Sequence, residues 1–357
     1  MRVLQLIDSL QAGGAERMAV NYANALVSHV EKSFLCATRE EGPLLDVVDK
    51  QVDYLFLNRL KTLDVKALNT MRAFVKDHKI NIIHAHGTSF FIASLLKIFK
   101  GSIVIIWHNH SFYTTSLPFT ERIGLRLCSH FFDVILCVNE PLQKWSRQIL
   151  GHKKAYYIKN FVVSNDHCLC PKTFKGVAGK RIVCVANFRP VKNHGLLLDA
   201  FAQVVKKDPE ATLHLFGSHF NDIYAQSILE IVKFNVPSVY YHGMHPALSS
   251  VLPLFDVGVL SSDSEGLPLA LLEYGQAGLP VVVTDVGQCR EVLGGYGSCV
   301  EVGNAKSLAK EMYHYLKNPK EGKKIGRAFQ REILDFYGRD TILPQVMKIY
   351  EEALKEI

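Results

Sequence analysis

Short apolar runs alternate with amphipathic segments along the whole chain. The runs are rich in Val, Ile and Leu without polar alternation, which is typical of strands buried on both faces of a parallel sheet. Eleven runs are predicted as strands: 3–7, 33–37, 53–57, 80–84, 103–107, 134–138, 182–186, 212–216, 239–242, 257–260 and 281–284. Because helical patterns separate them, the sequence predicts an α/β fold of two doubly wound units.

An irregular stretch from about Asn160 to Gly179 divides the two series of strands. It contains Pro171 and Gly176 and shows no clear period, so it is predicted as the linker. The predicted domains are therefore residues 1–165 and 166–340.

From Ala305 onward the pattern is only helical. It breaks near Pro319 and at Tyr337–Gly338. Residues 341–357 are predicted as one further helix.

The composition supports two sizeable cores, since 48% of the 357 residues are hydrophobic. Only five residues separate Arg2 from Asp8, too few for the apolar region of a secretory signal. The apolar stretch Phe90–Phe99 is interrupted by Lys97 and falls short of the ~20 residues that span a bilayer. The eight cysteines form no C-x-x-C pair, so we expect reduced thiols in a cytoplasmic protein.

The net charge of +7 is concentrated in the first half of the chain. Residues 1–165 hold 20 Lys and Arg against 13 Asp and Glu, whereas residues 166–357 hold 21 of each. A one-sided basic surface favours a polyanionic partner such as nucleic acid, anionic lipid or a diphosphate. No nucleic-acid recognition motif accompanies it, so nucleic-acid binding is not expected.

Two histidine pairs lie at or just after the ends of predicted strands, His84-Ala85-His86 and His108-Asn109-His110. Such spacing is compatible with metal ligation, but neither pair has a cysteine or carboxylate ligand near it in the sequence. We therefore expect no metal.

Three segments at predicted strand ends carry candidate chemistry. Gly13 and Gly14 open the first helix, where backbone amides attract anions. Arg189 and Lys192 follow the first strand of the second half, at the sheet edge where open α/β sheets bind ligands and where two cations suit a departing diphosphate.

The third segment is SSDSEGLPLALLEYGQAGLPVVVTD, residues 261–285. Pro268 is tolerated only in a first helical turn and Gly278 suits a helix end, so Glu265 is placed in a loop and Glu273 inside a short helix. Unpaired amides near the helix start would face a sugar hydroxyl or a phosphate oxygen, and they belong to Gly266, Leu267 and Leu269. A carboxylate one turn further in suits both hydroxyls of a ribose.

Taken in order, these motifs resemble glycosyltransferase family 4, which has the GT-B fold. The segments that carry the resemblance are GGAER, IIHAHG, His108, NFRPVKNH, EGLPLALLE and GQAGLPVVVTDVG with Glu291. The family resemblance implies two Rossmann-like domains facing across a cleft, acceptor in the first and nucleotide sugar in the second. It also implies a final helix, 341–357, packing back on the first domain.

The resemblance also implies roles for single residues. Glu273 would bind the nucleotide ribose, Glu265 the donor sugar, and Lys192 the diphosphate. The family's arginine commonly stands five residues before that lysine, where this chain has Asn187, so Arg189 is the expected substitute.

The first domain contributes the remaining implied roles. Gly14 would approach the donor phosphate, with Gly13 beside it. His108 would face the transferred sugar, with His110 as the competing candidate.

The implied reaction is retaining hexosyl transfer without cofactor or metal, from a sugar linked to UDP in preference to GDP. The cations would stabilise charge on the leaving diphosphate. The expected acceptor is a polyprenyl-diphosphate-linked or other glycan in bacterial surface polysaccharide assembly. The basic first domain, with SFFIASLLKIFKG and LPFTERIGLRL, suggests peripheral docking on the anionic inner leaflet of the plasma membrane.

Three alternatives remain to be weighed. A sugar-nucleotide 2-epimerase shares the architecture, but EGLPLALLE argues against it. A non-catalytic nucleotide-sugar-binding subunit is supported only by Asn187. The third alternative, a nicotinamide dehydrogenase, requires a G-x-G-x-x-G loop after the first strand, and this chain does not have one there.

Overall fold

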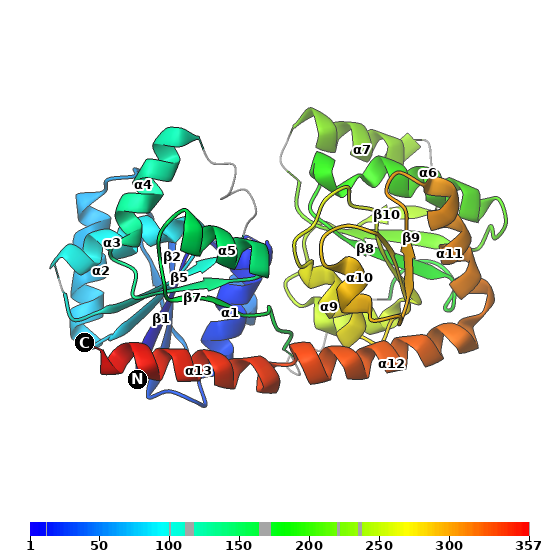
Figure 1. The fold of residues 1–357 in the computed structure, drawn as a ribbon. Coiled ribbons are helices and arrows are strands. Elements are labelled where there is room, and N and C mark those ends of the chain that lie inside the picture. The colour runs from blue at the N-terminus through cyan, green and yellow to red at the C-terminus, as the bar shows by residue number, and fades with distance from the viewer. Residues whose placement is uncertain are drawn as a thin grey trace. The chain divides into compact units, whose positions relative to one another are not determined.

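The chain forms two compact units, which are described separately (Figure 1). Unit 1 comprises Met1–Phe161 and Arg339–Ile357, and unit 2 comprises Val162–Gly338. The computed structural model describes residues 1–11, 13–99, 101–110, 118–163, 173–219, 222–234 and 238–356. Much of the predicted linker therefore lies outside the described residues.

Unit 1 is built on one parallel sheet with strand order β3-β2-β1-β4-β5-β6-β7. Its strands are β1 Arg2–Ser9, β2 Lys32–Glu40, β3 Asp53–Phe56, β4 Ile82–His86, β5 Val104–Asn109, β6 Val134–Cys137 and β7 Ala155–Tyr157. The order reverses between β1 and β4, the position where doubly wound sheets bind ligands.

Helices cover both faces of this sheet (Figure 1). They are α1 Gly14–Leu26, α2 Val65–Asp77, α3 Phe90–Phe99, α4 Phe119–Ser129, α5 Glu140–Gln148 and α13 Arg339–Lys355, with short 3₁₀ turns Pro43–Val47 and Gly87–Ser89. Side-chain caps fix several helix starts, as where Asp64 accepts from Ala67 N and Asn139 from Leu142 N.

Unit 2 repeats the plan with strand order β10-β9-β8-β11-β12-β13, all parallel. Its strands are β8 Arg181–Val185, β9 Thr212–Phe216, β10 Val239–Tyr241, β11 Val257–Leu260, β12 Val281–Thr284 and β13 Ser298–Val300. Its helices are α6 His194–Val205, α7 Ile223–Phe234, α8 Leu248–Val251, α9 Leu269–Gln276, α10 Cys289–Leu293, α11 Ala305–Lys317 and α12 Pro319–Tyr337, with 3₁₀ turns Pro190–Lys192 and Leu252–Leu254. Here the switch point lies between β8 and β11.

All eleven predicted strands are present, and the prediction of two parallel α/β units is confirmed. The sequence pattern missed β7 and β13. Both are three-residue edge strands, and neither begins with a β-branched residue, unlike the equally short β10, which begins with Val239.

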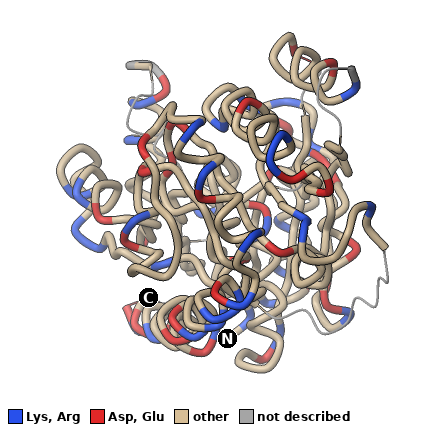
Figure 2. The backbone as a smooth tube through the Cα atoms, turned by 90° about the vertical axis from the view of Figure 1, so that its right-hand side faces the viewer, with Lys and Arg blue, Asp and Glu red and all other residues tan. Residues whose placement is uncertain are grey.

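The last helix, α13, belongs to unit 1 although it directly follows α12 of unit 2. The break occurs at Gly338, where a side chain would meet Leu334 O at 2.3 Å. Basic and acidic residues are interspersed along both helices (Figure 2). Tyr350 of α13 is nonetheless fully buried, so this helix completes the core of unit 1.

Among the described residues, no helix is long and apolar enough to cross a membrane. The six described cysteines are free thiols.

Candidate active site

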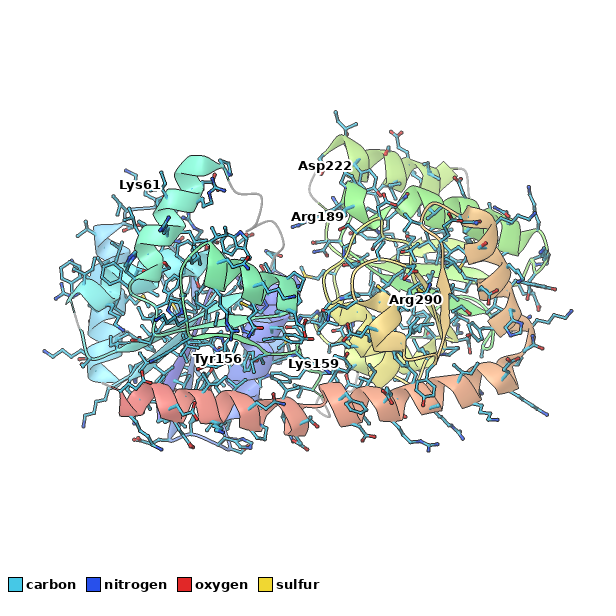
Figure 3. All side chains as sticks on the ribbon, viewed as in Figure 1. Lys61, Tyr156, Lys159, Arg189, Asp222 and Arg290 are labelled. Carbon is cyan, nitrogen blue, oxygen red and sulfur yellow. The ribbon has the colours of Figure 1, made fainter. Side chains whose placement is uncertain are left out.

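The loop that follows β8 brings a cation to the switch point of unit 2. Lys192 Nζ donates to Glu265 Oε1 at 2.6 Å, and the two side chains are 24% and 7% exposed. Arg189 lies three residues earlier at the start of the 3₁₀ turn and is exposed, on the loop labelled in Figure 3. The structure therefore joins Lys192 to Glu265, which the sequence placed at the ends of different strands.

The loop that follows β11 is held in place around Glu265. Ser262 Oγ donates to the same oxygen, Oε1, at 2.6 Å. Gly287, with φ of +54°, lies so close that a Cβ there would be 2.2 Å from Glu265 O. Gln288 N also donates to Gly266 O at 2.9 Å. The glycine thus lets two loops pack together and fix the Glu265 backbone.

The short helix α9 begins at Leu269, directly after Pro268, as the sequence predicted. Glu273 lies within it and is partly buried, and Gly278 ends it with φ of +72°. The first-turn amides have no carbonyl four residues earlier in the helix to bond with. Gly266, Leu267 and Leu269 therefore lie where predicted, at the start of a helix beside Glu265.

Asn187, which stands where an arginine was expected, makes a structural contact. Its Oδ1 accepts from Ser218 N at 3.0 Å and so links the loops that follow β8 and β9. Gly217 lies in the same turn, where a Cβ would be 2.1 Å from Ala186 O. This packing of two loops accounts for a short polar side chain at position 187.

In unit 1, α1 begins at Gly14 after the β1 strand, with Gly13 as its N-cap. A Cβ at Gly14 would meet nothing within 4 Å, and neither glycine has a positive φ. The fold itself therefore does not require glycine at position 14.

The two histidine pairs, which the sequence kept apart, converge in one buried cluster. His86 of β4 lies opposite His108 of β5, and alternate residues of each strand share a face. His84 Nε2 and His108 Nδ1 are 3.1 Å apart, and His86 Nδ1 and His110 Nε2 are 2.9 Å apart. The side chains of His84, His86 and His108 are fully buried, whereas His110 retains some exposure.

Burial keeps these imidazoles neutral. It lowers the pKa of His110 to about 3 and holds the pKa values of His84, His86 and His108 well below the usual range. Among the described residues, His84, His86 and His108 are the group whose ligand atoms lie close enough for one metal ion, within 4.8 Å of one another. The nitrogens of His84 and His108 that face each other already lie at hydrogen-bond distance, so an ion would have to replace that contact.

Sequence reasoning missed two members of this cluster. Gln5 of β1 and Tyr350 of α13 are both fully buried and bond to the histidines. Gln5 interrupts an apolar strand, which is a weak signal. Tyr350 lies on a helix with no motif, and nothing local marks it.

The two sheet edges thus offer different chemistry. Unit 2 presents a cation, a carboxylate and a helix start, which suit a diphosphate and sugar hydroxyls. Unit 1 presents neutral imidazoles.

Both halves of the chain match glycosyltransferase models. Residues 12–165 match Glycosyltransferase Family 4, and residues 179–318 match Glycosyl transferases group 1. The chain belongs to these glycosyltransferases and has their GT-B type of fold, as the resemblance implied.

The similar proteins include bacterial enzymes. The chain is 26% identical to the O-antigen biosynthesis glycosyltransferase WbnH of Escherichia coli over 83% of this chain and 85% of that protein. It is 22% identical, over 70% of each chain, to the Escherichia coli UDP-Gal:alpha-D-GlcNAc-diphosphoundecaprenol alpha-1,3-galactosyltransferase. The structure of Anabaena HepE with UDP and glucose aligns with a TM-score of 0.78 at 16% identity, covering 99% of this chain and 100% of that one.

Proposed function

We propose that this protein transfers a hexose-type sugar from a UDP-sugar to a lipid-linked glycan in bacterial surface polysaccharide synthesis, with retention of the anomeric configuration and without a metal. The observation that carries the proposal is the Lys192–Glu265 pair at the switch point of unit 2. The polysaccharide setting and the lipid carrier rest on the similar enzymes named above.

Lys192 supplies the positive charge that the leaving group needs. Negative charge grows on the departing diphosphate while the sugar becomes oxocarbenium-like. In the free protein, Glu265 holds the ammonium group, so Lys192 is oriented before the donor arrives. Arg189, exposed on the same loop, is the second cation toward the diphosphate.

Glu265 and Glu273 divide the recognition of the donor between them. The hydrogen bonds that Lys192 and Ser262 donate to Glu265 are both accepted by Oε1, so among the described residues Oε2 is the oxygen left for the hydroxyls of the sugar. Glu273 of α9 would accept the two hydroxyls of the ribose. Backbone amides of Gly266, Leu267 and Leu269 bind the sugar or phosphate oxygens.

Unit 1 would provide the acceptor side and approach the donor phosphate through Gly14, with Gly13 beside it. A backbone amide free of a side chain allows that close approach, and the open space around Gly14 agrees with it. His108, with His110 beside it, is the group toward the transferred sugar.

A mixed apolar and basic surface on unit 1 supports docking on an anionic membrane. Phe99 of α3 and Leu127 of α4 are 55% and 63% exposed, and Ile98 and Ile123 are exposed beside them on the same helices. Arg72 of α2 lies 4.5 Å over the Phe99 ring. Further exposed cations on or near α2 and α4 are Lys61, labelled in Figure 3, and Lys66, Lys76 and Arg126. Exposed apolar groups among cations suit the headgroup region of an anionic leaflet.

The central experiment is a calorimetric titration with UDP, GDP and their sugars in the presence of chelator. Selective binding of UDP and its sugar, followed by transfer that preserves the anomeric configuration in the product, would support the proposal. Binding of GDP alone would overturn the assignment of the carrier. A changed sugar without any acceptor would indicate an epimerase, and no binding of any nucleotide would indicate a non-catalytic subunit.

The membrane part is tested separately by sedimentation with phosphatidylglycerol vesicles at low salt. Phe99→Ser with Leu127→Ser should reduce binding, because apolar area and charge both contribute. Leu334→Ser, an exposed leucine on α12 of unit 2, is the matched control. Equal binding by both proteins would exclude this surface.

A further inference from the structure

The buried histidine cluster of unit 1 is hydrogen-bonded in two chains that start from one side chain, Gln5. Gln5 Oε1 lies 2.8 Å from His86 Nε2, and Gln5 Nε2 lies 3.5 Å from Tyr350 Oη. One chain continues from His86 to His110, and the other runs from Tyr350 through His84 to His108. A neutral imidazole carries one N–H proton, so one ring nitrogen donates and the other accepts. The direction of each hydrogen bond therefore determines the direction of the next one in the chain.

The first chain begins at the amide oxygen, which only accepts. His86 Nε2 must therefore donate to Gln5 Oε1, and His86 Nδ1 must accept. The donor to His86 Nδ1 is then His110 Nε2 at 2.9 Å. His110 is left with a lone pair on Nδ1.

The second chain begins at the amide nitrogen, which only donates. Gln5 donates to Tyr350 Oη, so the phenol proton goes to His84 Nδ1 at 2.6 Å. This direction is also the stronger one, since a phenol is a much better proton donor than a neutral imidazole. His84 Nε2 then donates to His108 Nδ1, and the proton of His108 lies on Nε2.

His108 Nε2 is a buried nitrogen with no hydrogen-bond partner among the described residues. A buried N–H without an acceptor destabilises the free protein and is satisfied when a ligand supplies an oxygen. This is the group of the cluster that a bound hydroxyl or phosphate oxygen would complete.

We propose that Gln5 and Tyr350 are positioning residues that lock His84, His86, His108 and His110 in the Nε2–H tautomer. The His-Asn-His segment then offers two different groups, an N–H donor at His108 Nε2 and a lone pair at His110 Nδ1. The assignment of these groups to the sugar rests on the proposed function, whereas the tautomers are a property of the protein alone.

The direct test is long-range ¹H–¹⁵N correlation NMR on protein labelled with ¹⁵N-histidine. Each signal is assigned from the variant in which that histidine is replaced by Gln. All four histidines should show the Nε2–H pattern in the wild type. The reversed orientation of the Gln5 amide would give Nδ1–H at all four, and that result overturns the proposal.

Tyr350→Phe tests whether the hydroxyl of Tyr350 fixes the tautomers of His84 and His108. It removes the donor to His84, so His84 and His108 should lose the fixed tautomer while His86 and His110 keep theirs. Transfer should then fall about tenfold in kcat, with nucleotide affinity unchanged because the donor binds in unit 2. An unchanged His108 pattern in this variant would contradict the proposal.

Tyr22→Phe is the matched control. Tyr22 is equally buried and packs on the same rings, 5.0 Å from His84 and 5.8 Å from His108 between centroids, but its hydroxyl bonds to none of the described residues. It should leave tautomers and kcat unchanged, and equal losses in both variants would show a packing effect only.

Metal analysis tests the remaining alternative, that the histidines bind a metal ion. One equivalent of a transition metal whose removal shifts the His84 and His108 resonances would show that these nitrogens ligate an ion instead. If the tautomers are as stated but no nucleotide sugar is used, the proposed function fails and this inference stands.

Discussion

The two parallel sheets share their strand order around the switch point, but different polar groups lie at their edges. At the switch point of unit 2, Lys192 and Glu265 form a charged pair that remains partly exposed. At the corresponding edge of unit 1, His84, His86 and His108 are fully buried and neutral. The same strand order thus supports an ionic site in one unit and a hydrogen-bonded neutral site in the other.

The proposed function gives a reason for this difference. A diphosphate carries charge and must be exchanged with solvent, so its site needs cations that water can reach. A sugar hydroxyl is neutral. A buried imidazole with a fixed tautomer can bind it through a hydrogen bond whose donor and acceptor are defined in advance. Four predictions test whether the two edges differ in this way.

Lys192→Ala should have the largest effect, because it removes the charge that stabilises the leaving diphosphate. We expect transfer to fall roughly 10³-fold in kcat, measured as UDP release in the presence of acceptor. Lys180→Ala is the control, since Lys180 forms a similar pair with Asp208 in unit 2, 27% and 11% exposed. Equal losses of transfer activity in both variants would show that losing any ion pair of unit 2 has this effect, and would contradict a specific role for Lys192.

His108→Ala should leave nucleotide binding intact and reduce transfer about 10²-fold. Calorimetry with UDP and the transfer assay separate the two. His214→Ala provides the control, because His214 is a buried histidine of unit 2 that bonds to His242 at 2.9 Å outside the candidate site. If only His110→Ala gives this result, the sugar-facing group lies two residues later.

Glu273→Ala should weaken nucleotide binding by about 1.5–3 kcal/mol, the range for hydrogen bonds to a charged group. The measurement is the calorimetric Kd for UDP. Glu321→Ala, an exposed carboxylate of α12 that pairs with His314, should bind as the wild type does. An unchanged Kd for the Glu273 variant would remove this residue from the ribose site.

Acid should destabilise unit 1 through its neutral histidines. The pKa of His110 falls from about 6.5 in the unfolded chain to about 3 in the folded one, so the unfolded state binds the extra proton. The free energy of unfolding should drop by about 1.4 kcal/mol per pH unit for this group, between pH 6.5 and 3. Trp107 and Trp145 both lie in unit 1, so denaturant unfolding followed by fluorescence reports on it.

His110→Gln should reduce that slope by the contribution of one group. An equal slope in the variant would mean that His110 is protonated in the folded protein.

Much of the fold followed from local patterns. Apolar runs located eleven strands, and Pro268 with Gly278 located α9, because a strand period and a helix start depend on neighbouring residues. The edge strands β7 and β13 were missed because neither begins with a β-branched residue, whereas the equally short β10 begins with Val239 and was found.

Some residues of the candidate site could also be predicted from the sequence, whereas others could not. Its unit 2 candidates were recognised because they lie in two short continuous segments, the loop after β8 and the loop after β11 with the start of α9. Gln5 and Tyr350 were not, since a buried polar residue becomes meaningful only when its partner is known.

Local patterns in the sequence predicted the two doubly wound units, and the resemblance of its ordered motifs predicted the glycosyltransferase class. The roles of Lys192, Glu265 and Glu273, which the same resemblance implies, stay predictions. The folded structure shows, beyond the sequence, that Lys192 meets Glu265 and that Tyr350 reaches His84. These contacts join residues 73 and 266 positions apart. Packing of whole elements creates them, and no local period encodes a hydrogen bond over such distances.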